Sequence, residues 1–507
     1  MPAFDFHTLS LTIDSTFEEY DSATGVSQGA TILGLNIADV LRGDRSKFLR
    51  FRHEHAHFTS FVGSGLVDLY GVLSDYLSLL CYVVLREEVK ESPETLWVPV
   101  YDARRPDHAA LHSAYQQLNA VRALLFGFGS RTPLGAILDS AVQDAFWQRR
   151  YESRFQLMVG RYYDLLRRLA GAPHPMTEGE ASGPSQPSVS VGGKQRPLSA
   201  RAVMEAYAIT IELAATHLRK VESNLTHYGS PTARQPGPLY TVALQHVLEH
   251  LRWPEPVSLE AFLTGRAPLE CYYVVPVLTF AAMQVPVLQI LEGDYLVWGD
   301  RRNLSVAHAF DLIVAGIEDG ALAAPPPNLR NSENADQELL DWLGTCRSRL
   351  GDDSTMQIYT EVQKAFERDE RLKAMSATSQ TISELVWAGR ANFLREPAEY
   401  VLDAGLFAEA YPCQPRFVRT ADNRVIGLAD DGNSGLLQAR YVSEQAVPIL
   451  EAAVFGEQWE SVWAKLPEVA QEDRPGLVQA AIFAIAAQFD DLDAIGDPPP
   501  VQVSPSL

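Results

Sequence analysis

Apolar and polar side chains alternate in two stretches near the N-terminus, at 7–14 (HTLSLTID) and 29–38 (GATILGLNIA). Gly25 and Gly29 punctuate the polar segment between them. A period of two predicts half-buried β-strands, and glycines between two such runs favour a turn. We therefore expect residues 1–42 to form a β-hairpin or a small sheet.

From residue 44 onward the apolar positions recur with the spacing of amphipathic helices. One helix is predicted over 44–62, ended by Gly63 and Gly65, and a strongly apolar one follows over 66–89. Ser199 is a suitable N-cap for another helix, which we place at 198–221. Further helices are predicted at 107–127, 133–147, 149–170, 238–252, 270–291 and 305–316. Together these elements predict a helical region over 43–322, interrupted at 172–197 by a flexible loop rich in Pro, Gly and Ser.

Residues 323–327 (AAPPP) mark a boundary before a second, mainly helical region at 328–497. Its pattern predicts helices at 335–349, 354–375 and 379–394, and a hairpin at 415–429. Residues 498–507 form a Pro-rich tail. The expected fold class is mainly α with small β elements, an α+β fold in which a large helical body carries any functional site.

Composition narrows the classes of function. The chain has 507 residues, of which 46% are hydrophobic, so it can bury a large core. Its net charge of −22 disfavours binding to nucleic acid or to anionic lipid. The four cysteines show no CxxC spacing, which is typical of reduced core residues in a cytoplasmic protein. The N-terminus has no signal-peptide pattern, and the apolar segment 272–291 is interpreted as a buried helix rather than a membrane span.

The pattern His-Glu-x-x-His occurs once, at His53, Glu54 and His57. On a helix the two histidines lie one turn apart on the same face, where they can hold one Zn²⁺ at about 2.0–2.1 Å each. Glu54 can then act as a general base that accepts a proton from a water molecule on the metal. This division of roles is typical of a zinc metallopeptidase.

A catalytic zinc normally takes a third protein ligand. A third histidine six residues after His57 is excluded, because Gly63 occupies that position. Asp68 is one alternative, in a GLVDLYG segment similar to an element of aspzincin peptidases. Glu205 is the second alternative, and Glu87 and Glu88 belong to a run of surface charge.

Residues 51–58 (FRHEHAHF), followed much later by 202–208 (AVMEAYA), resemble the two halves of a gluzincin site. They are similar in particular to bacterial proteins with a His-Glu-Tyr-x-His-Phe motif. The resemblance implies that His53, His57 and Glu205 bind Zn²⁺ and that Glu54 is the catalytic base. It implies a zinc-dependent hydrolase acting on a protein or peptide substrate. Tyr207 and His217 share the predicted helix of Glu205 and are candidates for oxyanion support. The resemblance identifies neither the substrate nor the oligomeric state.

A rival motif, His246-x-x-Glu249-His250, matches the inverted zinc pattern. Its surroundings show no alternation of strands and helices, so we interpret it as the face of an ordinary amphipathic helix. A different class of function also fits the composition. An acidic helical body with a Pro-rich tail suits an interaction or scaffold protein that holds a structural metal or none.

Overall fold

The computed structural model describes residues 3–5, 10–13, 16, 18–19, 45–64, 66–91, 94–102, 104, 115, 187–223, 238–284, 306–326, 333–349, 389, 392–402, 417–422, 425–427, 446–456, 459–464, 466–467, 469–488 and 500–504. Over these residues the chain is mainly helical with short strands, so the predicted fold class is confirmed. The helices are α3 (Arg45–Val62), α4 (Leu66–Glu91), α9 (Ala200–Ser223), α10 (Pro238–His250), α11 (Leu259–Leu263), α12 (Cys271–Met283), α14 (Val306–Glu318), α15 (Ala335–Arg349), α19 (Pro397–Val401), α21 (Ala446–Phe455), α22 (Trp459–Ala464) and α23 (Arg474–Gln488), with a 3₁₀ turn at Gln471–Asp473. The strands are β1 (Ala3–Asp5), β2 (Ser10–Thr12), β3 (Leu96–Val98), β4 (Ser188–Val191), β5 (Lys194–Pro197), β6 (Phe417–Arg419), β7 (Val425–Gly427) and β8 (Val501–Val503).

Several predicted helices appear within one to three residues of their expected ends. This holds for α3, α4, α9, α10, α14 and α15, because each has a regular apolar face and a local start or stop signal. The helices predicted at 133–147, 149–170 and 354–375 lie outside the described residues, and those at 107–127 and 379–394 lie largely outside them. The strand expected at 29–38 also lies outside the described residues.

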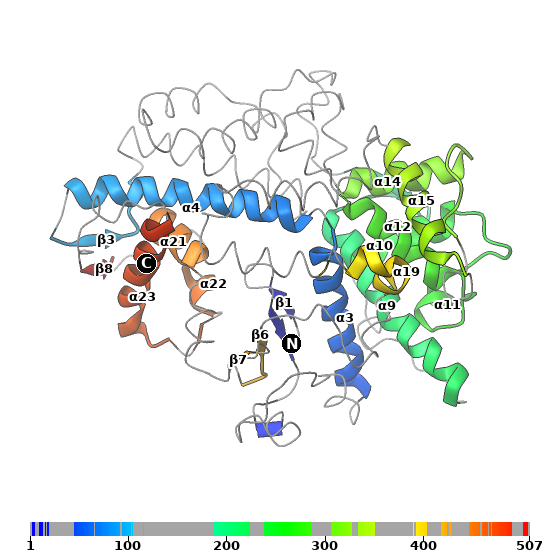
Figure 1. Ribbon diagram of the computed structural model, residues 1–507, viewed down its shortest axis with the longest axis horizontal. Coiled ribbons are helices and arrows are strands. Elements are labelled where there is room, and N and C mark those ends of the chain that lie inside the picture. The colour runs from blue at the N-terminus through cyan, green and yellow to red at the C-terminus, as the bar shows by residue number, and fades with distance from the viewer. Residues whose placement is uncertain are drawn as a thin grey trace.

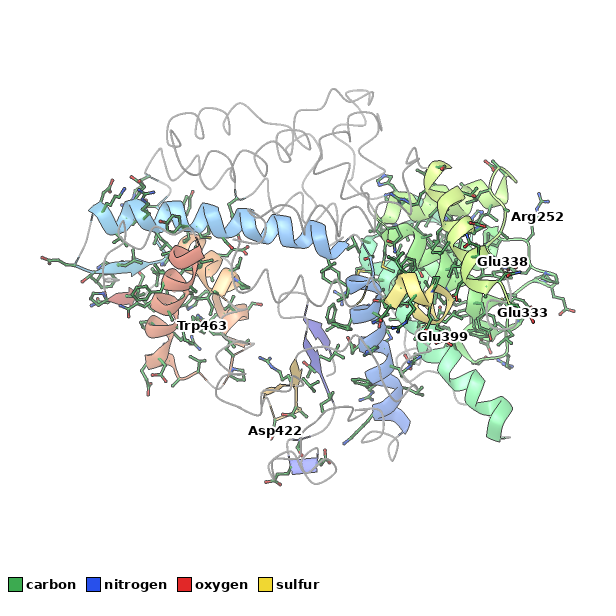
Figure 2. The ribbon with its side chains drawn as sticks, viewed as in Figure 1. Arg252, Glu333, Glu338, Glu399, Asp422 and Trp463 are labelled. Carbon is green, nitrogen blue, oxygen red and sulfur yellow. The ribbon has the colours of Figure 1, made fainter. Side chains whose placement is uncertain are left out.

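Helix α12 is the centre of the helical group that Figure 1 shows in green and yellow. Every one of its residues is buried, and it contacts α9, α14, α15 and α19. Within the described part of the chain, no helix has the length and apolar character needed to cross a membrane. Exposed carboxylates such as Glu333, Glu338 and Glu399 lie on this group (Figure 2).

A second helical group consists of α21, α22 and α23, drawn in orange and red in Figure 1. The long helix α4 contacts α3, and it also packs against α21 and α23 of this second group. Its position therefore links the region around α3 to the C-terminal helices (Figure 1).

A small sheet with the strand order β1-β2-β6-β7 joins the N-terminal strands to residues 417–427. Strands β1 and β2 are antiparallel, and β2 pairs in parallel with β6, which forms a hairpin with β7 inside the predicted 415–429 segment. Phe4 of β1 meets the rings of Phe58 and Phe61 on α3 at centroid distances of 6.0 and 5.9 Å. The segment predicted as a β-hairpin or small sheet, 1–42, thus contains the antiparallel pair β1–β2, and β2 also pairs with a strand more than 400 residues away.

Strands also occur in two segments for which none was predicted. The predicted flexible loop at 172–197 contains an antiparallel hairpin, β4 and β5, whose turn residues Gly192 and Gly193 adopt positive φ angles of 57° and 70°. Glycine adopts such angles without steric cost, so the small residues serve a tight turn here. The predicted Pro-rich tail at 498–507 contains β8, which pairs in parallel with β3.

Candidate metal centre

Helix α3 is buried along most of its second half. Between residues 51 and 64 every residue is buried except Glu54, which is partly exposed. His53 and His57 lie one turn apart on the side that contacts α9, and their rings meet edge to face with centroids 5.0 Å apart. The helical spacing thus places two imidazoles together against a neighbouring helix.

Helix α9 begins after Ser199, whose hydroxyl group accepts a hydrogen bond from the backbone N–H of Ala202 at 3.1 Å. The predicted N-cap is therefore confirmed. All residues from 202 to 214 are buried, and the small side chains of Ala202 and Ala206 flank the turn that carries Glu205. Small residues allow two helices to approach closely, and α3 and α9 pack directly against each other.

The structure brings His53, His57 and Glu205 together. Glu205 Oε2 lies 3.1 Å from His53 Nε2 and 3.6 Å from His57 Nε2. One potential ligand atom from each residue lies within 4.8 Å of the other two. Ligands of a tetrahedral zinc at about 2.0–2.1 Å are about 3.3–3.4 Å apart, so these separations fit a zinc ion bound by both Nε2 atoms and one carboxylate oxygen.

Two further charged side chains contact this cluster. Glu212, which is completely buried, places its Oε2 atom 3.3 Å from His53 Nδ1. Arg201 is half-exposed, and its Nε atom lies 3.5 Å from the outer oxygen of Glu205, Oε1. Both residues belong to α9. Arg201 lies four residues before Glu205 and Glu212 seven residues after it, and these helical spacings place the side chains on the same face.

The buried carboxylates determine how the metal-free cluster titrates. Burial disfavours a charged imidazole at His53, but hydrogen bonding to Glu205 and Glu212 outweighs it and raises the pKa of His53 to about 10. Burial also opposes ionisation of Glu205, yet its contacts with His53 and His57 lower the pKa of that carboxyl group. The cluster is therefore built to surround a positive charge, which a divalent cation would supply in place of the proton.

Glu54 differs from the three clustered residues in its exposure. The side chains of His53, His57 and Glu205 are 5%, 10% and 7% exposed, whereas Glu54 is the partly exposed residue in an otherwise buried stretch. Its negative charge also raises the pKa of His53, but by less than the contacts with Glu205 and Glu212 do. Glu54 is thus the one partly solvent-accessible residue between 51 and 64, and it follows His53 directly in the sequence.

The other residues singled out from the sequence have different surroundings. Asp68 lies in the first turn of α4, and its side chain falls outside the described ones, as does that of His217 on α9. The hydroxyl group of Tyr207 is buried and donates a hydrogen bond to the backbone carbonyl of Val401 at 2.9 Å. A role for Tyr207 in stabilising an oxyanion would require this hydrogen bond to be given up.

The rival motif forms contacts between elements. Nδ1 of His250 lies 2.9 Å from Glu318 on α14, and its Nε2 lies 3.2 Å from the carbonyl oxygen of Ser190 on β4. Glu249 accepts hydrogen bonds from the backbone N–H of Gly192 in the hairpin turn. His246 is buried, with its Nε2 atom 3.1 Å from Asp311 on α14, so the interpretation of the motif as an ordinary exposed helix face is corrected.

Glu212 lies two turns after Glu205 on the same helix, and its carboxylate is placed against His53. The contact of Arg201 was missed, although its spacing of four residues from Glu205 was the available signal.

Comparison with known proteins identified no relative of this chain. No protein-family model matches the chain, and searches of curated proteins and of solved structures found no match. Fold and site together define a mainly helical protein with a buried cluster of two histidines and one glutamate that could hold a metal ion.

Proposed function

We propose that this protein is a zinc-dependent metallopeptidase that hydrolyses peptide bonds. The observation that carries the proposal is the convergence of His53, His57 and Glu205, whose potential ligand atoms all lie within 4.8 Å of one another. His53 and Glu205 are 152 residues apart in the sequence, so local helix geometry alone does not account for their contact. The donor set of two imidazoles and one carboxylate is that of catalytic zinc sites.

In the proposed reaction, zinc supplies Lewis acidity that polarises the substrate carbonyl and makes water more acidic. His53, His57 and Glu205 hold the metal, and Glu54 accepts the proton of the attacking water. Glu54 then passes that proton to the amine nitrogen that leaves. The partial exposure of Glu54 supports this role, because the base must meet both water and substrate.

The burial of the three ligands favours a second candidate, an interaction protein in which a metal only fastens α3 to α9. Structural zinc sites almost always have four protein ligands, whereas catalytic sites have three and leave one position for water. The described side chains supply a group of three, which supports the catalytic alternative.

The substitution Glu54→Gln tests the proposal. It keeps the size of the side chain but removes the base, so we expect kcat on a peptide library to fall by about 10²–10⁴-fold while bound zinc stays near one ion per chain. Zinc content is measured by mass spectrometry and cleavage by detection of new peptide termini. His53→Ala should lose the metal as well as the activity.

The matched control is Glu88→Gln, which changes another partly buried helical glutamate, on α4. It should retain both zinc and activity. Wild-type protein with stoichiometric zinc but no hydrolysis, or Glu54→Gln protein as active as wild type, would contradict the peptidase assignment.

The proposed setting is the cytoplasm, with a protein or peptide as substrate. Cys81 and Cys271 are buried thiols, which supports a reducing compartment. The net charge of −22 argues against nucleic acid as a partner.

A further inference from the structure

We propose that Glu212 is the positioning residue that fixes the ring of His53 for metal binding. The inference rests on the proposed metal centre and adds to it a residue that is not itself a ligand. His53 lies between two carboxylates of the same helix. Its Nε2 atom is 3.1 Å from Glu205 Oε2, and its Nδ1 atom is 3.3 Å from Glu212 Oε2.

The helix geometry of α9 explains this arrangement. Glu205 and Glu212 are separated by two helical turns and therefore lie on the same face of the helix. One imidazole inserted between them presents a different nitrogen atom to each. The ring is held at both ends by a single rigid element, so its orientation is set before a metal arrives.

The chemistry of imidazole determines which ring nitrogen of His53 can bind the metal. A neutral imidazole carries one proton, and the nitrogen that binds a metal must be the one without it. An ionised carboxylate accepts hydrogen bonds and cannot donate them, so a carboxylate 3.3 Å from Nδ1 favours the tautomer that carries its proton there. The lone pair of Nε2 then points toward His57 and Glu205, where the ligand atoms converge.

The burial of Glu212 supports a role tied to a cation. Its side chain is completely buried, and an ionised carboxylate is costly to bury without compensating charge. A divalent cation bound by His53 would lie close to this carboxylate and supply positive charge beside it. Among the ion pairs of the described residues, Glu212 lies against Nδ1 of His53, whereas His57 is paired through its Nε2 atom, with Glu205.

The test is the affinity for Zn²⁺ of Glu212→Gln, measured by competition with a chromophoric chelator. The variant keeps the shape of the side chain but loses its charge and can also donate, so it no longer selects one tautomer. We expect the affinity to fall by about 10–100-fold. The melting temperature of the metal-free protein is measured in parallel.

Glu451→Gln is the matched control, because Glu451 is also a buried glutamate and accepts a hydrogen bond from Tyr115 at 2.8 Å. It lies on α21 and outside the metal cluster, so its substitution should change stability but not zinc affinity. A merely structural role of Glu212 would give the two variants the same behaviour, with unchanged affinity in both, and would overturn the inference.

Nuclear magnetic resonance of the His53 ring nitrogens in zinc-loaded wild-type protein gives a readout that needs no variant. We expect a proton on Nδ1 and coordination through Nε2, and the reverse assignment would overturn the inference even if Glu212→Gln did not fold. If Glu212→Gln bound zinc as tightly as wild type and His53→Ala did not bind zinc, the positioning role of Glu212 would be wrong. The proposed metal centre would still be supported. Wild-type protein without zinc affinity would overturn both.

Discussion

Three histidines on one helix have three different environments. His53 contacts two carboxylates of α9, and His57 contacts one of them. His55 points into other surroundings, with its Nδ1 atom 3.2 Å from the hydroxyl group of Thr59 and its ring beside Phe51 and Phe58. Position around the helix axis, and not residue type, therefore decides which imidazole can bind a metal.

Gly63 follows the last residue of α3 at a point where only a hydrogen atom fits. A Cβ atom there would overlap the ring of Tyr400, which is held by a hydrogen bond of 3.0 Å from its hydroxyl group to the carbonyl of Thr59. We expect Gly63→Ala to lower the free energy of unfolding by about 1–3 kcal/mol, measured by chemical denaturation, because the buried ring must shift.

Gly344→Ala is the matched control for this prediction, since a Cβ atom at Gly344 on α15 meets nothing within 4 Å. Alanine is the better helix former, so this substitution should leave stability unchanged or raise it. Equal losses in both variants would show that the contact with Tyr400 is not what requires glycine at position 63.

At the scale of elements, α9 connects the candidate site to the rest of the helical group. It packs against α3, α10, α12 and α14, and the hairpin β4–β5 leads directly into its N-cap. The hairpin in turn is attached to α10 by Glu249 and His250. The element that carries Glu205 is therefore fixed from several sides.

The attachment of the hairpin should depend on pH. Both neighbours of the His250 ring, a carboxylate oxygen and a carbonyl oxygen, can only accept, so the two hydrogen bonds form together only when both nitrogens carry protons. Burial lowers the pKa of His250, but hydrogen bonding to Glu318 and Ser190 outweighs this and raises it above the ordinary value.

Because the folded-state pKa is raised, the stabilisation is complete below the ordinary histidine pKa and is lost as pH rises through the raised value. We expect hydrogen exchange in the hairpin to accelerate over that range in wild-type protein, beyond the intrinsic increase with pH. His250→Gln should remove this additional step in the exchange rate. A step of equal size in the variant would show that His250 does not control the attachment.

At the scale of the whole molecule, contacts between distant segments hold the parts together. Strand β2 pairs with β6, β3 pairs with β8, and α4 reaches the C-terminal helices (Figure 1). The candidate metal centre is one more such contact, since it joins α3 to α9 through buried polar side chains.

Removal of zinc should therefore lower the stability of the folded protein. A ligand that binds only the folded state at about 100 times its Kd adds about 2.7 kcal/mol, so a chelator should lower the Tm of zinc-loaded wild-type protein measurably. The Tm of His53→Ala should not respond to the chelator. A response of the same size in this variant would place the bound metal elsewhere.

The sequence by itself determined the features that depend on neighbouring residues. The helical periodicity of α3, the one-turn spacing of His53 and His57 and the N-cap at Ser199 all follow from backbone geometry over a few residues. Glu205 could be named as a candidate, but Asp68 remained an alternative because ligand chemistry alone does not determine which helices meet.

Only the tertiary structure decided which distant segments come together. It placed Glu205 against both histidines, turned Glu212 toward His53, paired β2 with β6 and used the small residues after position 187 for a hairpin. The physical reason is that such contacts depend on how complementary faces pack over the whole chain, and local propensity does not contain that information.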